Sequence, residues 1–146
     1  MIMAKPEDFP LVSGTYRMTS EWSIVLPQPF RRRIENGSRV LWRPGITAWI
    51  NVWNNDNDES REARLSRIQT DRSSKAFNNI RRDDSHILRY AYRLHEKGGD
   101  NRMPALYAFA IGTAGHVQMA VYFDSEETLS AAEGLWQSLR EQLDAT

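Results

Sequence analysis

The chain has 146 residues, with 19 basic and 19 acidic side chains that leave no formal net charge at pH 7, and it contains no cysteine. This length predicts a single domain that is large enough to bury a core without covalent cross-links. The charge balance argues against nucleic-acid binding, because such proteins usually carry a clear basic excess. The absence of cysteine excludes disulfides, thiolate metal sites and cysteine nucleophiles.

The first eight residues lack the apolar core of a signal peptide, and no apolar run approaches the roughly 20 residues that cross a bilayer. We therefore expect a soluble, cytoplasmic protein of bacterial type with no membrane partner. Pro6 and Pro10 disfavour regular pairing, so residues 1–13 are expected to be a loose lead-in to one domain at 14–146.

The first half of that domain is rich in strand and turn signals. Residues 14–20 and 22–26 are short strand candidates, the second closed by Pro27 and Pro29. Asn36-Gly37 separates two strand-like runs at 30–35 and 38–43, which is a strong hairpin signal because both residues tolerate positive φ.

Residues 46–53 alternate so that both faces of the predicted strand carry apolar side chains. One face is uniformly apolar, and the other carries Thr47, Trp49, Asn51 and Trp53. A strand of this kind belongs in a sheet that is covered on at least part of each side.

A helix is predicted from about residue 59 to 71, with Asp56 and Glu59 as a capping box. Residues 73–85 show no clear period and are expected to form an irregular segment on the surface. Residues 86–94 then alternate as a strand, with Tyr90 and Tyr92 on one face and Arg89 and Arg93 on the other.

The last third is the most strongly patterned part of the chain. Two apolar runs at 105–111 and 117–123 flank Gly112-Thr113-Ala114-Gly115, which predicts a hairpin. Ser125 then caps a helix whose apolar stripe runs at three- and four-residue steps from Leu129 to Leu143. Together these elements predict an α+β domain, with an antiparallel twisted sheet of about six or seven strands and helices packed on it.

No catalytic or metal-binding motif emerges. His86, His95 and His116 have no recognised ligand spacing, and each fits an edge or turn position. Asp56, Asp58 and Glu59 are spaced somewhat like a calcium loop, but the central glycine and distal glutamate are missing. We expect no metal, no cofactor and no catalytic residue.

Arginine and tryptophan on the strands before residue 54 are the strongest candidates for function. On a strand, Arg31 and Arg33 share a face, and Trp42, Trp49 and Trp53 come from successive strands. In one interpretation the tryptophans belong to the core and the arginines to a solvated sheet edge. In the other, they form a hot spot for binding another protein. The predicted partner-binding surface combines five residues: Trp49, Trp53, Arg31, Arg33 and Arg43.

The segment Trp22-Ser23-Ile24-Val25-Leu26-Pro27, followed by a hairpin, a helix, further strands and a closing Tyr122-Phe123-Asp124 helix unit, resembles the PsbP-like group. This resemblance spans about residues 14–143. It implies an α/β/α sandwich and a non-catalytic scaffold that acts by binding partners.

The sequence therefore favours a non-catalytic protein-interaction or accessory module whose partner is another protein. The alternative is a small-molecule-binding protein or enzyme with a pocket between sheet and helix that uses His86, Tyr90 or Tyr92. A homodimer that pairs its own exposed aromatic residues is a third reading.

Overall fold

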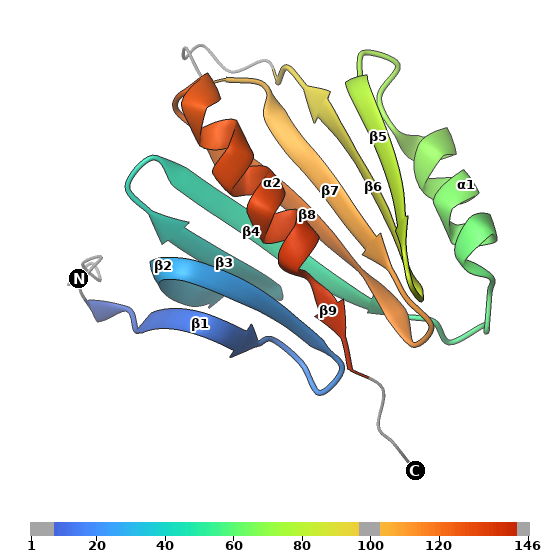
Figure 1. The fold of residues 1–146 in the computed structure, drawn as a ribbon, viewed down its shortest axis with the longest axis horizontal. Helices are drawn as coiled ribbons and strands as arrows, with labels where there is room; N and C mark the ends of the chain where they lie inside the picture. The colour runs from blue at the N-terminus through green and yellow to red at the C-terminus, as the bar shows by residue number, and fades with distance from the viewer. Residues whose placement is uncertain (1–7, 97–102, 143–146) are drawn as a thin grey trace.

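The structure is a computed structural model that describes residues 8–96 and 103–142. Within them, nine strands form one antiparallel sheet in the order β1-β2-β3-β4-β8-β7-β6-β5, and β9 pairs with β2. Figure 1 shows α2 lying along one face of this sheet, while α1 lies beside β5 and β6. The chain is therefore α+β, as predicted, but the sheet has more strands than the six or seven expected.

Most strands that follow one another in the chain are antiparallel neighbours in the sheet. Their bounds are β1 Leu11–Arg17, β2 Trp22–Glu35, β3 Ser38–Arg43, β4 Ile46–Asn54, α1 Arg61–Asp71, β5 Phe77–Asp84, β6 Ile87–Leu94, β7 Ala105–Ile111, β8 Gly115–Phe123, the 3-10 helix η2 Glu126–Thr128, α2 Leu129–Ser138 and β9 Arg140–Glu141. No helix in these described ranges has the length and apolar character needed to cross a membrane.

The larger core lies between α2 and one face of the sheet. Leu135 and Trp136 of α2 are buried there against a set that includes Trp22 and Leu41. The indole N–H of Trp136 donates a hydrogen bond to the carbonyl oxygen of Phe109 at 2.9 Å. The predicted inward-facing stripe of this helix is confirmed as far as the structure describes it.

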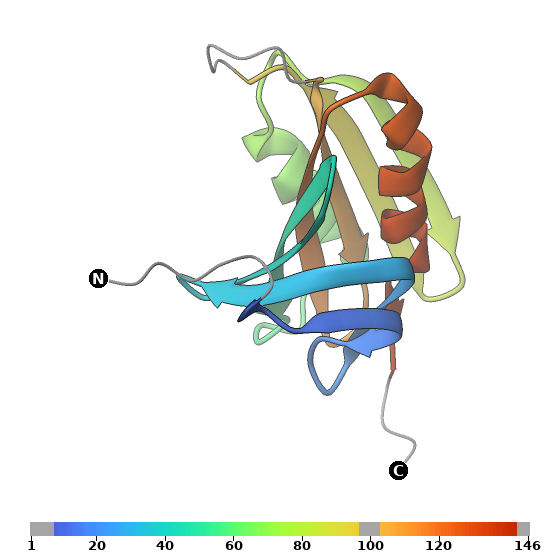
Figure 2. The same cartoon turned by 90° about the vertical axis from the view of Figure 1, so that its left-hand side faces the viewer.

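A smaller core lies on the opposite face, under α1. Leu65 of α1 packs there with a group of sheet residues that includes Tyr90, Tyr92 and Phe109. Figure 2 shows α1 and α2 on opposite sides of the sheet, with β1 and β2 turning across the direction of the other strands. Because α1 is short, it covers only part of its face.

β2 is one continuous strand, whereas the sequence predicted two strands interrupted at Pro27 and Pro29. Leu26 pairs with Gly14 and Phe30 pairs with Val12, so both prolines lie in a bulge opposite Ser13. On the other side of β2, neither β3 nor β9 pairs with this stretch. The missing proline N–H groups therefore interrupt no hydrogen-bonded ladder.

Two further segments differ from the sequence-based expectation. Residues 73–85, expected to be irregular, contain the edge strand β5. This strand is exposed at nearly every position, which explains why it has no apolar period. The segment expected to be a loose lead-in ends inside β1, since residues 11–13 are part of that strand; residues 1–7 lie outside the described residues.

The C-terminal helix is shorter than predicted, because α2 ends at Ser138 and the chain continues as β9; Leu143 lies outside the described residues. Arg89, buried on β6, donates hydrogen bonds to the carbonyl oxygens of Trp136 and Leu139 at 3.0 and 2.8 Å. These bonds add a charged donor to carbonyl groups at the helix end, which also accept from the N–H of Leu139 and from the side chain of Arg140.

Both predicted hairpins are confirmed. Asn36 and Gly37 have φ angles of 50° and 86° in the turn between β2 and β3, and β7 pairs with β8 across the glycine-rich turn. The predicted helix α1 is also present, but its N-cap is Ser60, whose hydroxyl accepts from the N–H of Ala63. The prediction of Asp56 as the cap was wrong because the loop continues for four more residues before the helix begins.

Candidate functional site

The side of the sheet that carries α1 is only partly covered. Side chains of β2, β3, β4 and β8 that point to this side form what we call the open face, since α1 packs over β6 and β7 instead. Strand register fixes its rows: Trp49 lies opposite Val40 on one side and Ala120 on the other, and Trp53 lies opposite His116. The open face comprises Arg31, Arg33, Trp42, Thr47, Trp49, Asn51, Trp53, His116, Gln118 and Tyr122.

An arginine stacked on two tryptophans occupies the β2–β4 part of the open face. The guanidinium carbon of Arg33 lies 4.8 Å from the ring centroid of Trp42 and 5.7 Å from that of Trp49. Its Nε and Nη2 donate to Glu35 at 3.0 and 2.8 Å. Val40, which lies between these side chains, is fully buried. Cation–π contact and the ion pair together hold Arg33 in one orientation.

Arg31 extends this cluster along β2. Its guanidinium donates to the carbonyl oxygen of Phe9 at 2.8 Å, and the Phe9 ring meets Trp42 edge-on at 5.3 Å. We call Arg31, Arg33, Trp42 and Trp49 the Arg–Trp patch.

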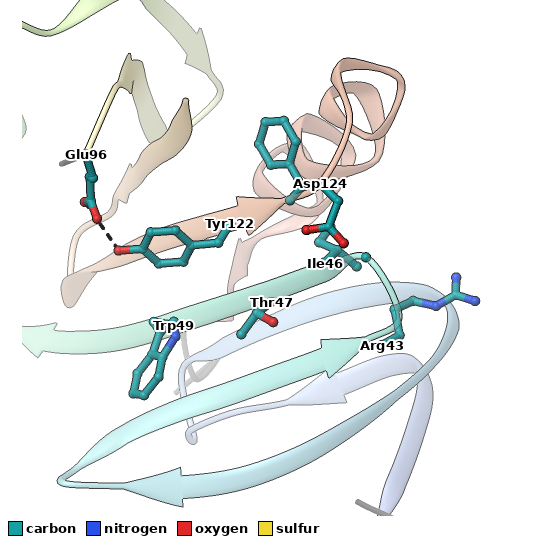
Figure 3. Close-up of a pocket in the computed structure, with 9 residues that line it drawn as sticks. Arg43, Ile46, Thr47, Trp49, Glu96, Tyr122 and Asp124 are labelled. Atoms are coloured by element: carbon teal, nitrogen blue, oxygen red, sulfur yellow. Dashed lines mark hydrogen bonds between the residues drawn. The ribbon is translucent and has the colours of Figure 1, made fainter. Parts of the chain in front are cut away.

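A first hollow opens beside the Arg–Trp patch, with a volume of about 540 Å³. Figure 3 shows Trp49 and Thr47 of β4 on one side and Tyr122 of β8 on the other, with the Tyr122 hydroxyl donating to Glu96 at 3.4 Å. The Arg43 side chain extends away from Trp49, and its guanidinium carbon lies 5.9 Å from the ring centroid of Phe30. Arg43 is thus on the rim of this hollow, outside the Arg–Trp patch.

A second hollow of about 460 Å³ lies at the other end of β4 and β8, where α1 stands beside the open face. Trp53 is 53% exposed, and its ring stacks on that of His116 with centroids 6.5 Å apart and an interplanar angle of 21°. Burial and the nearby charges of Arg64 and Arg67 lower the pKa of His116 to about 4, so its imidazole is neutral at pH 7. Its Nδ1 atom is buried and has no hydrogen-bond partner in the described part of the chain.

α1 supplies the opposite wall of the second hollow. Arg64 is buried and donates to the carbonyl oxygens of Gly112 and Gly115, so it fastens α1 to the β7–β8 turn; desolvation lowers its pKa. Arg67 pairs with Glu59 at 2.8 Å. Both arginines thus already have partners within the chain, and their positive charges disfavour protonation of His116.

The predicted partner-binding residues are therefore distributed over one face with one exception. Arg31, Arg33 and Trp49 belong to the Arg–Trp patch, and Trp53 lies further along β4 beside the second hollow. Arg43 points elsewhere, because it pairs with the inward-facing Ile46.

The structure brings together two residues of the alternative pocket, Tyr90 and Tyr92, whose ring centroids lie 6.0 Å apart in the core under α1, but His86 does not join them. Tyr90 is buried under α1, where it bonds Asn79 and Arg72, and burial raises its pKa. Tyr92 is also buried and stacks on Tyr107 at 5.4 Å. His86 lies before β6, with its Nε2 3.7 Å from the carboxylate of Glu141.

The sequence does not predict the second hollow, because its residues come together only through strand register and the position of α1. His116 lies 63 positions after Trp53 in the chain, and only the β4–β8 pairing places the two rings together. Within the described ranges, no group of three or more histidine, aspartate or glutamate side chains is arranged to hold a metal ion.

No family model, curated protein or solved structure matches this chain. Function must therefore be argued from the geometry of the open face.

Proposed function

We propose that this chain is a non-catalytic interaction module that binds an acidic surface of another protein through the Arg–Trp patch. The observation that supports this proposal most strongly is the stack of Arg33 on Trp42 and Trp49, on a part of the sheet that no described helix covers. Arginine and tryptophan are the residue types in which protein interfaces concentrate their binding energy.

The patch is pre-organised. Arg33 is held by Glu35 and by two rings, and Arg31 is held by a backbone carbonyl. Side chains that are ordered before binding lose less conformational entropy when a partner docks. A partly exposed tryptophan such as Trp49 contributes contact area with few rotatable bonds.

Local charge favours an acidic partner. On the open face of β2 and β3, Arg31 and Arg33 are accompanied by one carboxylate, Glu35, in a chain whose total charge is zero. The other arginines of these strands point to the opposite face. A carboxylate on the partner would meet Arg31 and Arg33, and an apolar side chain would cover Trp49. Charge complementarity of this kind speeds encounter and rejects basic surfaces.

The same proposal includes a place in the PsbP-like group and a cytoplasmic location. The order of strands and helices supports the first, and the absence of cysteine, typical of proteins in a reducing compartment, supports the second.

The test compares matched charge reversals in capture experiments from the native cell extract. Arg33→Glu reverses a charge in the patch, and Arg82→Glu reverses an exposed charge on the edge strand β5. We expect a protein retained by the wild type and by Arg82→Glu to be lost with Arg33→Glu and with Trp49→Ala, while circular dichroism shows each variant folded.

Two outcomes would overturn the proposal. One is retention of the same proteins by all four forms. The other is loss of the captured material after nuclease treatment, which would show that a nucleic acid and not an acidic protein occupies the patch.

A further inference from the structure

The second hollow has a flat aromatic wall at one end. Trp53 stacks against His116 on one side and is more than half exposed, so a ligand in the hollow has an indole surface to contact. The face of an indole carries negative charge density and attracts C–H groups with partial positive charge. A ring that offers several C–H groups on one face is suited to this wall.

Charged groups around the hollow nearly balance. Arg64 and Arg67 come from α1, and Asp56, Glu59 and Asp71 complete the set. Arg67 is paired with Glu59, and Arg64 is held by two backbone carbonyls. A cation entering toward His116 would be repelled by the charges of both arginines, whereas an anion would be repelled by Asp56 and Asp71.

The polar lining offers both hydrogen-bond donors and acceptors. Asn54, Asn57 and Gln118 carry amides that can donate and accept, and the carboxylate of Asp71 accepts. A ligand whose rim carries hydroxyl groups can use both kinds of partner, because each hydroxyl donates one hydrogen bond and accepts others.

From these three features we infer that the second hollow binds a saccharide unit, that is, a neutral ring with C–H groups on one face and hydroxyl groups around its rim. The ring stacks on Trp53, and its hydroxyl groups bond Gln118, Asp71 and the amides of Asn54 and Asn57. The volume of about 460 Å³ is within the range of small-molecule sites and accommodates one or two such rings.

This inference is independent of the proposed protein partner. Arg31, Arg33, Trp42 and Trp49 do not line the second hollow, so loss of either activity leaves the other testable.

The experiment is saturation-transfer NMR on the whole chain with N-acetylglucosamine and the methyl glycosides of glucose, galactose and mannose. Adenine, a flat neutral ring without a sugar, is the control ligand. We expect at least one saccharide to bind with its strongest saturation at ring C–H protons. Trp53→Ala should weaken that binding by about tenfold or more, and Trp49→Ala should leave it within about twofold.

Gln118→Ala provides a second variant that leaves the aromatic wall in place, and it should also weaken saccharide binding. The inference is overturned if no saccharide binds more tightly than about 10 mM. It is also overturned if binding survives both Trp53→Ala and Gln118→Ala, or if adenine binds at Trp53 and no saccharide of the panel does.

Discussion

Protonation of His116 should weaken the fold as the pH falls. In the folded chain its pKa is about 4, compared with 6.5 for a free imidazole, because burial and the charges of Arg64 and Arg67 oppose the cation. Between these two values the unfolded chain binds a proton at this position and the folded chain does not. Stability from this residue is therefore complete above about pH 6.5 and is lost as the pH falls toward 4.

The size of the effect follows from the shift. Each pKa unit corresponds to about 1.4 kcal/mol, so the full loss below pH 4 is about 3 kcal/mol. At about pH 5 the loss is about 2 kcal/mol, since most unfolded chains are then protonated at His116 and most folded chains are not.

Urea denaturation at about pH 7.5 and about pH 5 measures this loss. The control is His116→Gln, which removes the titrating group while His86 and His95 remain in both proteins. We expect the wild type to lose about 2 kcal/mol more than the variant between the two pH values. Equal losses would refute the assignment of His116 as a partly buried imidazole that stays neutral in the folded chain.

Three further substitutions, two of them paired with a control substitution, test the fold by urea denaturation. Arg89→Leu should destabilise the chain by about 2–3 kcal/mol, because two buried hydrogen bonds from a charged donor to the end of α2 are lost, whereas Arg82→Ala on the exposed edge strand should change stability by less than about 0.5 kcal/mol. Ser60→Ala should cost about 1 kcal/mol and Asp56→Ala less than about 0.5 kcal/mol, and the reverse order would contradict the observed N-cap. Gly115→Ala should cost about 1–3 kcal/mol, since its Cβ would collide with a backbone carbonyl oxygen of β4, and an unchanged midpoint would refute that close approach.

Elements whose signals are local could be predicted from the sequence. The Asn36-Gly37 turn needs only two residues that tolerate positive φ, and the α2 stripe needs only the period of its own apolar residues. β5 could not be predicted in this way. Its side chains are exposed on both faces, so what makes it a strand is pairing with β6 and not any pattern of its own.

Tertiary context also explains why Pro27 and Pro29 were misleading. Proline ends a strand when a neighbour needs its N–H, and here a bulge in β2 opposite Ser13 removes that need. Nothing in the residues around them reveals where the bulge will fall.

Only part of the candidate site could be predicted from the sequence in this way. Strand alternation was enough to place Arg31 with Arg33 and Trp49 with Trp53, because residues two or four apart share a face. The neighbours of Trp53 in the second hollow come from α1 and β8, and their approach depends on which strands pair.

Footprinting of the captured complex tests the proposed role of the open face most directly. Hydrogen exchange of the chain alone and in the complex should show new protection across residues 31–35 and 40–53, with no change at α2 on the opposite face. Protection confined to the edge strands β1 or β5, or to α2, would contradict a partner docked on the Arg–Trp patch.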